Sequence, residues 1–255
     1  MTSLFSAFTP SELSAAFAVA LVAGTVKGMV GFAMPMILVS GLSMFMPPEI
    51  ALAGLILPTV VTNGMQAFRH GFAAAVQSLK RFRLFLLVGL VFLLGSAQLV
   101  RVLPQQVMLL IIGVPVSLFA LTQLMGKQLT LARPTPRSEV LVGGFAGLIG
   151  GMSGIWGPPT VAYLTALGTE KNEQIRVQGV IYGMGAVALL AGHIGSGVMR
   201  AETAPFSVAL ILPAVMGMWI GGRLHDRIDQ VAFRRLTLFV LLVAGLNLLR
   251  RALML

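Results

Sequence analysis

The sequence predicts an all-α integral membrane protein with two inverted repeats, each a Gly-rich helical hairpin plus three transmembrane helices. Of its 255 residues, 57% are hydrophobic and only 10% are charged, which is too little charge for the surface of a soluble globule. A glycine-rich segment near the start also recurs 123 positions later. We therefore expect a first repeat at 1–125, a cytoplasmic linker at 126–138 and a second repeat at 139–255.

The recurring segment is AGTVKGMVGFAMP at 23–35 and AGLIGGMSGIWGP at 146–158. The copies keep Ala, Gly, Gly, Met, Gly and Pro at the same spacing. Each copy interrupts an apolar stretch with residues that break helices. Interruptions at corresponding places in two halves of a membrane protein are a pointer to the binding site of a transporter.

Six further stretches are apolar and are predicted to be transmembrane helices. Each is long enough, or nearly so, to cross roughly 30 Å of hydrocarbon as a helix. They lie at about 50–67, 84–101, 106–125, 177–198, 204–222 and 233–250.

The two motif regions, 12–46 and 139–169, are each too long for one crossing. Their arms fall short of one: residues 13–27 would reach ~22 Å and residues 35–46 ~18 Å. We therefore expect each region to form a hairpin with its turn inside the membrane, where protein or a water-filled cavity must surround non-helical backbone.

The Lys and Arg residues test this topology. If both hairpins return to their own side, thirteen of the seventeen Lys and Arg residues other than Lys27 lie on one face. If each hairpin crosses the membrane, the split is ten to seven. The positive-inside rule favours the hairpins and places both termini outside. The halves then have opposite orientations.

Glycines at the hairpin tips permit positive φ and close backbone approach, and leave amides unpaired at the start of the helices that contain Pro35 and Pro158. These tip glycines are Gly28, Gly31, Gly151 and Gly154. Unpaired amides at helix N-termini attract anions, so two tips near the midplane would cradle an oxyanion. The alternative is small-residue packing between helices, but duplication at identical spacing favours the site.

Lys27 is the one cation within an apolar arm, next to the first tip. A lysine at that depth is costly and indicates a functional role, here as the charge partner of an anion. A snorkelling topology anchor is the alternative. Gly150 occupies the matching position in the second half, so this charge is asymmetric.

Further side chains near the tips, or in the spans that follow them, are candidate substrate contacts. They are Phe32, Asn63, Gln66, Ser153, Trp156 and Tyr182. Polar residues also join membrane helices to one another, which is the alternative for Asn63, Gln66 and Tyr182.

Three residues are candidates for gating or coupling. His70 and His193 match at the 123-residue offset and would carry protons, although capping at helix ends is the interpretation we favour. Arg176 would gate or steer an anion, with a positive-inside anchor as the alternative.

Several classes of function lack the residues they need. The acidic residues fall near segment ends or in loops, which argues against a cation carrier. Cysteine, a paired-His zinc helix and a P-loop lysine are absent from the sequence. The net charge of +10 is explained by orientation signals. We expect no enzyme activity, cofactor, metal or nucleic acid; the expected partners are a small anion and the lipid bilayer, with a homodimer left open.

The two motifs resemble the duplicated signatures of the sulfite exporter TauE/SafE family. The resemblance rests on Gly24, Lys27, Gly28, Gly31, Phe32 and Pro35, and on Gly147, Gly151, Gly154, Gly157, Pro158, Pro159 and Tyr163, with the turn from Lys171 to Arg176. It implies a bacterial inner-membrane permease that exports small sulfur-containing or organic anions such as sulfite or sulfonates, and the outside face that holds both termini is then the periplasm. We expect alternating access around the two tips; an anion channel that uses the same tips is the alternative. Ala33 and Met34 stand where many members have another glycine.

Overall fold

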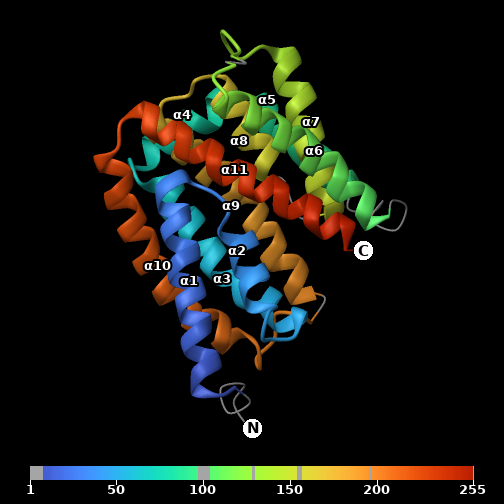
Figure 1. Cartoon of the computed structure of the whole chain (residues 1–255), viewed down its shortest axis with the longest axis vertical. Helices are drawn as coiled ribbons and strands as arrows, with labels where there is room; N and C mark the ends of the chain where they lie inside the picture. The colour runs from blue at the N-terminus through green and yellow to red at the C-terminus, as the bar shows by residue number, and fades with distance from the viewer. Residues whose placement is uncertain (1–7, 97–103, 128–129, 154–156, 196, 255) are drawn as a thin grey trace. The chain divides into compact units, whose positions relative to one another are not determined.

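The computed structural model describes residues 8–96, 104–127, 130–153, 157–195 and 197–254, which form helices and contain no strand (Figure 1). The helices are α1 (Pro10–Val30), α2 (Met34–Leu42), α3 (Pro48–Phe68), α4 (Phe72–Arg81), α5 (Arg83–Ser96), α6 (Gln105–Leu124), α7 (Pro136–Ser153), α8 (Gly157–Ala166), α9 (Lys171–Gly195), α10 (Ala204–Arg227) and α11 (Gln230–Leu253). Among them α1, α3, α9, α10 and α11 are long and apolar enough to cross a membrane. The predicted all-α membrane protein is confirmed at this level.

The first motif region differs from the prediction in the length of its first arm. Helix α1 has 21 residues, about 31 Å, so the expectation that this arm falls short of a crossing is wrong. A capping box between Thr9 and Glu12 starts the helix earlier than predicted. The helix also continues through Gly28 to Val30. The second arm, α2, is short, with 9 residues.

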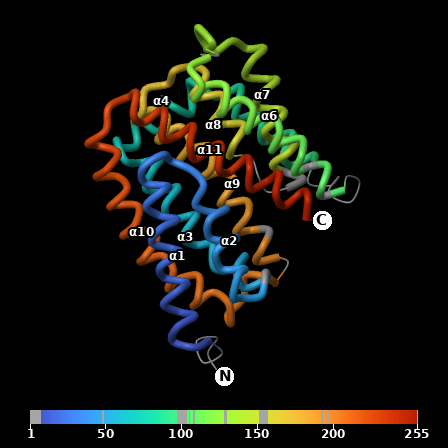
Figure 2. The backbone as a smooth tube through the Cα atoms, viewed as in Figure 1, coloured from blue at the N-terminus to red at the C-terminus, as the bar shows by residue number. Residues whose placement is uncertain are grey.

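The chain reverses direction between α1 and α2 (Figure 2). Gly31 ends α1 with φ 88°, and Ala33 precedes α2 with φ 73°. Helix α2 then packs back along α1: a Cβ on Gly41 would lie 2.6 Å from the side chain of Val19. Leu42 and Ala16 share one apolar core.

The second motif region contains α7, with 18 residues, and α8, with 10. Residues 154–156 between them lie outside the described part of the chain. Near its end, α8 comes back to the start of α7, because the hydroxyl groups of Tyr163 and Ser138 are 3.1 Å apart and hydrogen-bonded. The Tyr163 ring also stacks on Phe85 of α5.

The structure contains two compact units, residues 1–75 with 175–229 and residues 76–174 with 230–255. Unit 1 contains α1, α2, α3, α10 and nearly all of α9, and unit 2 contains α5, α6, α7, α8 and α11. Each unit therefore combines helices from both sequence repeats. The repeat boundaries remain a prediction about the duplication.

Glycines allow one close helix pair in each unit. In unit 1, a Cβ on Gly24 of α1 would lie 2.1 Å from the carbonyl oxygen of Ala214 in α10. In unit 2, a Cβ on Gly147 of α7 would lie 2.1 Å from the carbonyl oxygen of Gly89 in α5. Neither contact leaves room for a side chain, so backbone packs directly on backbone.

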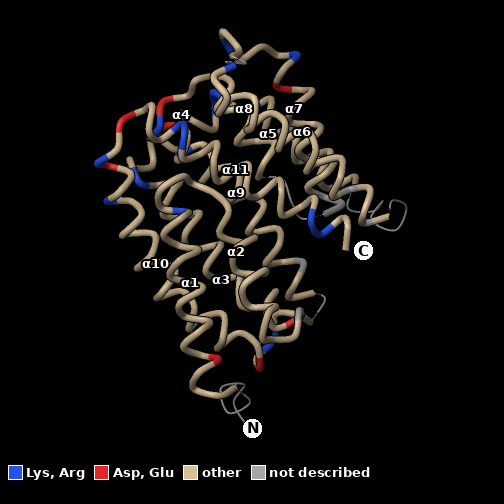
Figure 3. Tube along the Cα trace, in the orientation of Figure 1, with Lys and Arg blue, Asp and Glu red and all other residues tan. Residues whose placement is uncertain are grey.

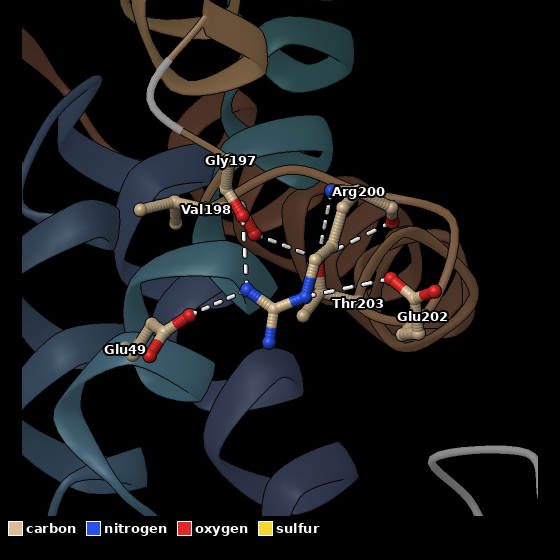
Figure 4. Close-up of polar contacts among 6 residues, drawn as sticks. All are labelled: Glu49, Gly197, Val198, Arg200, Glu202 and Thr203. Atoms are coloured by element: carbon tan, nitrogen blue, oxygen red, sulfur yellow. Dashed lines mark hydrogen bonds and ion pairs between the residues drawn. The ribbon is translucent and has the colours of Figure 1, made fainter.

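Charged residues gather at helix ends (Figure 3). In unit 1, ion pairs lie at both ends of α3. Arg200, in the loop before α10, pairs with Glu49 at the start of α3 at 2.7 Å and with Glu202 at 3.4 Å (Figure 4). At the far end of α3, Arg69 pairs with Asp226 of α10 at 2.6 Å. Helices α3 and α10 are thus linked at both ends.

Helix α4 is an element that the sequence analysis did not predict. It lies between the predicted spans 50–67 and 84–101, carries Lys80 and Arg81 in its last turn, and leaves Phe72 exposed at its start. Apolar and basic residues on separate faces are typical of a helix at a membrane surface.

Candidate functional site

Lys27 lies on α1, one turn before the helix ends at Val30, and its side chain is only 1% exposed. Its Nζ donates hydrogen bonds to Thr62 Oγ1, at 2.9 Å, and to Asn63 Oδ1. Both partners belong to α3 of the same unit. A snorkelling lysine would extend toward the surface, so this inward placement argues against that alternative.

The ammonium of Lys27 has no acidic partner among the described residues, whose ion pairs join arginines to carboxylates elsewhere. Taking a cation out of water is costly unless an opposite charge or several hydrogen bonds compensate it. Here two neutral oxygens accept from it. A protonated Lys27 therefore places an uncompensated positive charge in a buried place.

Polar side chains form a stripe on the face of α3 that meets Lys27, because residues three and four apart lie on one side of a helix. All are buried: Thr59, Thr62, Asn63 and Gln66. Thr62 donates its hydroxyl proton to the carbonyl of Pro58 at 2.6 Å, so its oxygen accepts from Lys27. Asn63 accepts through Oδ1 and retains two N–H donors on Nδ2.

Two amides hold the turn after α1. The carbonyl of Gly31 accepts from Gln66 Nε2 of α3 at 3.0 Å. It also accepts from Gln178 Nε2 of α9 at 3.0 Å when the Gln178 amide is oriented with its nitrogen toward this carbonyl, which can only accept. Gln178 also donates to the carbonyl of Val30 at 3.2 Å. Gly31 needs its positive φ, and a Cβ there would lie 1.9 Å from the Gln178 amide. The turn is therefore built for glycine.

The start of α2 adjoins the Lys27 contacts, because Met34 Sδ lies 3.7 Å from Thr62 Oγ1. Ala33 precedes the helix, Pro35 occupies its first turn, and no described side chain caps its N-terminus. A helix N-terminus carries about half a positive charge. This end of α2 adds to the positive character of the site.

The structure places Gly28 differently from the other tip residues. It lies within α1, and a Cβ there would be 2.3 Å from the carbonyl oxygen of Met218 in α10. Close packing, the alternative to a binding role, accounts for this glycine.

The remaining candidates near the first tip and in the spans after each tip differ in how deeply they are buried. Phe32 and Tyr182 are buried, and Tyr182 follows Gln178 by one turn of α9. His70 is exposed after α3, while Arg176 and His193 are partly buried on α9. Their roles remain predictions.

The second tip lies mostly outside the described residues. Gly151 and Ser153 belong to the last turn of α7, but their side chains are not described. Gly154 and Trp156 fall outside the described residues altogether. Their predicted substrate contacts remain predictions.

Three residues of the site were not among the sequence candidates. Thr62 precedes a candidate, Asn63, and its spacing from Gln66 was an available signal. Gln178 lies just beyond a basic turn, where its sequence neighbours indicate nothing about the first tip. His225 of α10 is fully buried, with Nδ1 3.1 Å from the carbonyl oxygen of Met29.

Apolar helices, a reversal at a glycine turn and a buried lysine without an acidic partner among the described residues define a multi-pass helical membrane protein with a buried basic side chain. The model of the sulfite exporter TauE/SafE family matches residues 16–248, nearly the whole chain, and the chain belongs to that family. Membership implies a membrane transporter of sulfur-containing anions and is consistent with a protein that is not an enzyme. Comparisons with individual curated proteins and with solved structures gave no match.

Proposed function

We propose that this protein is a secondary transporter that exports small sulfur-containing or organic anions, such as sulfite or sulfonates, and that Lys27 binds the anion. One observation carries the proposal: the side chain of Lys27 is only 1% exposed, and its hydrogen-bond acceptors, Thr62 and Asn63, are both neutral. An anion beside this ammonium would supply the missing opposite charge. Binding would then offset part of the cost of burying the cation.

Three groups of unit 1 act on the anion in this proposal. The ammonium of Lys27 donates a charge-assisted hydrogen bond to an anionic oxygen. Asn63 donates through Nδ2, since its Oδ1 is occupied by Lys27. The uncapped start of α2 contributes its backbone amides and its dipole.

The duplication supports a second half-site at the other tip, with Gly151, Ser153, Gly154 and Trp156 as its residues. Glycine packing of α1 on α10 and of α7 on α5 is reciprocal between the sequence halves, which supports the inverted repeat. Access alternates around the tips in this mechanism. A negative-inside potential favours anion exit by ~2.3 kcal/mol per charge per 100 mV.

The proposed location is the bacterial inner membrane with both termini in the periplasm. It is supported by the thirteen Lys and Arg residues that this topology places on the cytoplasmic face. Reporter fusions to the C-terminus and to the segment 126–138 test the orientation. A cytoplasmic C-terminus would contradict the inverted repeat.

Counterflow in proteoliposomes tests the transport mechanism. Vesicles preloaded with unlabelled sulfite should accelerate the uptake of labelled sulfite, because a carrier returns faster when it is loaded on the far side. The alternative, an anion channel, predicts no acceleration. Absence of sulfite and sulfonate binding, measured by calorimetry on the purified protein, would contradict the proposed substrate class.

A further inference from the structure

Gln66 carries a buried hydrogen-bond acceptor that the contacts described so far do not use. Its side chain is fully buried, and its Oε1 has no hydrogen-bond partner among the described residues. A buried polar atom without a partner is uncommon in proteins and is costly.

The neighbouring carbonyl fixes which end of this amide is unpaired. Nε2 of Gln66 lies 3.0 Å from the carbonyl oxygen of Gly31, which can only accept. The nitrogen must therefore face Gly31, and the oxygen must be the unpaired atom. Helix α9 packs closely on α3 at this point, since a Cβ on Gly179 would lie 2.6 Å from Gln66 Cβ.

The unpaired oxygen lies one helical turn from the cation contacts. Gln66 follows Asn63 by three residues on the same face of α3, a rise of ~4.5 Å. Lys27 reaches Asn63 from α1, and Gln66 reaches Gly31 at the end of the same helix. Both groups therefore lie between the end of α1 and one face of α3.

We propose that Gln66 Oε1 is a specificity-determining acceptor for a hydrogen-bond donor on the transported anion. The inference rests on the proposed function. The favoured ligand carries two features: an anionic oxygen for Lys27, and an O–H or N–H group a few atoms away for Gln66. Anions of the same size without a donor leave the Gln66 oxygen unpaired and bind more weakly.

Two sulfonates that differ by one hydroxyl group test this inference on the full-length purified protein. Calorimetry should show that 2-hydroxyethanesulfonate binds roughly tenfold more tightly than ethanesulfonate. In Gln66→Met the ratio of the two affinities should fall to about one. The ratio is the measured quantity, because loss of the hydrogen bond from Gln66 to Gly31 acts on both ligands alike.

Gln178→Met is the matched control, because it removes the other amide from the Gly31 carbonyl and leaves Gln66 in place. The tenfold ratio should persist in this variant, which separates recognition by Gln66 from support of the turn. Equal affinities in the natural protein, or a ratio that survives Gln66→Met, would overturn the inference and leave the proposed function standing. Failure of both sulfonates to bind the natural protein would overturn the inference, and failure of sulfite to bind as well would overturn the proposed function. The first measurement needs no variant, so poor folding of Gln66→Met does not remove the test.

Discussion

The two copies of the glycine motif share their packing but not their chemistry. Gly24 in unit 1 and Gly147 in unit 2 occupy matching sequence positions, and each lies against the backbone of a helix from the other half. Lys27, by contrast, is matched by Gly150. The duplication has thus kept the residues that bring helices together, while only the first copy carries the cation.

The polar stripe on α3 shows the same asymmetry. At the 123-residue offset, Asn63 is matched by Ala186 and Gln66 by Leu189. Small and apolar residues replace both hydrogen-bonding amides in the second half. The comparison teaches that internal symmetry identifies the scaffold of this protein, and that departures from symmetry identify its candidate site.

The largest expected effect concerns the shared packing. Gly24→Leu and Gly147→Leu should each destabilise the protein by about 3 kcal/mol or more, since any side chain there meets a backbone oxygen that cannot move aside. Thermal unfolding of the purified variants, with the yield of folded protein, measures this. Similar losses in both units would sharpen the comparison, and tolerance in one unit would break it.

Gly64→Ala in α3 is the control for those substitutions. A Cβ on Gly64 meets no atom within 4 Å, so alanine should leave stability unchanged or raise it by up to about 1 kcal/mol. A strong loss in this variant would show that helix glycines in general, rather than those at close contacts, limit stability.

The next effect concerns the first turn. Gly31→Leu should abolish transport while much of the protein still inserts, because leucine disfavours the φ of 88° and clashes with the Gln178 amide. Gly154→Leu is the matching variant of the second copy. Transport in proteoliposomes and the amount of inserted protein are the two measurements. Near-normal transport by either variant would remove that tip from the mechanism.

Lys27→Met tests the difference between the copies. Loss of the charged donor should weaken sulfite or sulfonate binding by about 10- to 100-fold, the range for a hydrogen bond to a charged group. Thermal stability should stay level or rise, because the variant removes an uncompensated buried charge. Lys27→Arg should retain part of the affinity. Unchanged affinity in Lys27→Met, measured by calorimetry, would exclude Lys27 from the site.

The smallest effect is expected at the ends of unit 1. Arg200→Gln breaks ion pairs whose side chains are about half exposed, 47% for Arg200 and 53% for Glu49. Such pairs contribute about 0.2–1 kcal/mol, and salt screens them. Chemical denaturation at low and high salt measures this contribution. A loss comparable to that of Gly24→Leu would show that charges, rather than glycine contacts, hold unit 1 together.

Apolar length predicted most helices of the fold well. The predicted spans 50–67, 204–222 and 233–250 fall within α3, α10 and α11. Apolar length failed for two helices. The capping box at Thr9 makes α1 longer than its apolar arm, and α4 has too few apolar residues to be recognised as a span. Charged ends also extend α10 to Arg227, since a helix can continue beyond its apolar core.

The candidate site was predictable only in part. Lys27, Asn63 and Gln66 were expected from their residue types in apolar segments, but their mutual contacts depend on which face of α3 meets α1. That face is decided by packing between residues about 35 positions apart, which local patterns do not encode. Thr62 and His225 were missed for this reason.

The backbone of Ala33, in the turn between α1 and α2, is strained. Ala33 adopts φ 73°, a left-handed conformation that costs a residue with a β-carbon about 1–2 kcal/mol, whereas Gly31 adopts φ 88° without that cost. The turn is therefore strained at residue 33 as it stands between α1 and α2. Glycine would adopt the same φ without this cost, so Ala33→Gly should stabilise the turn by up to that amount.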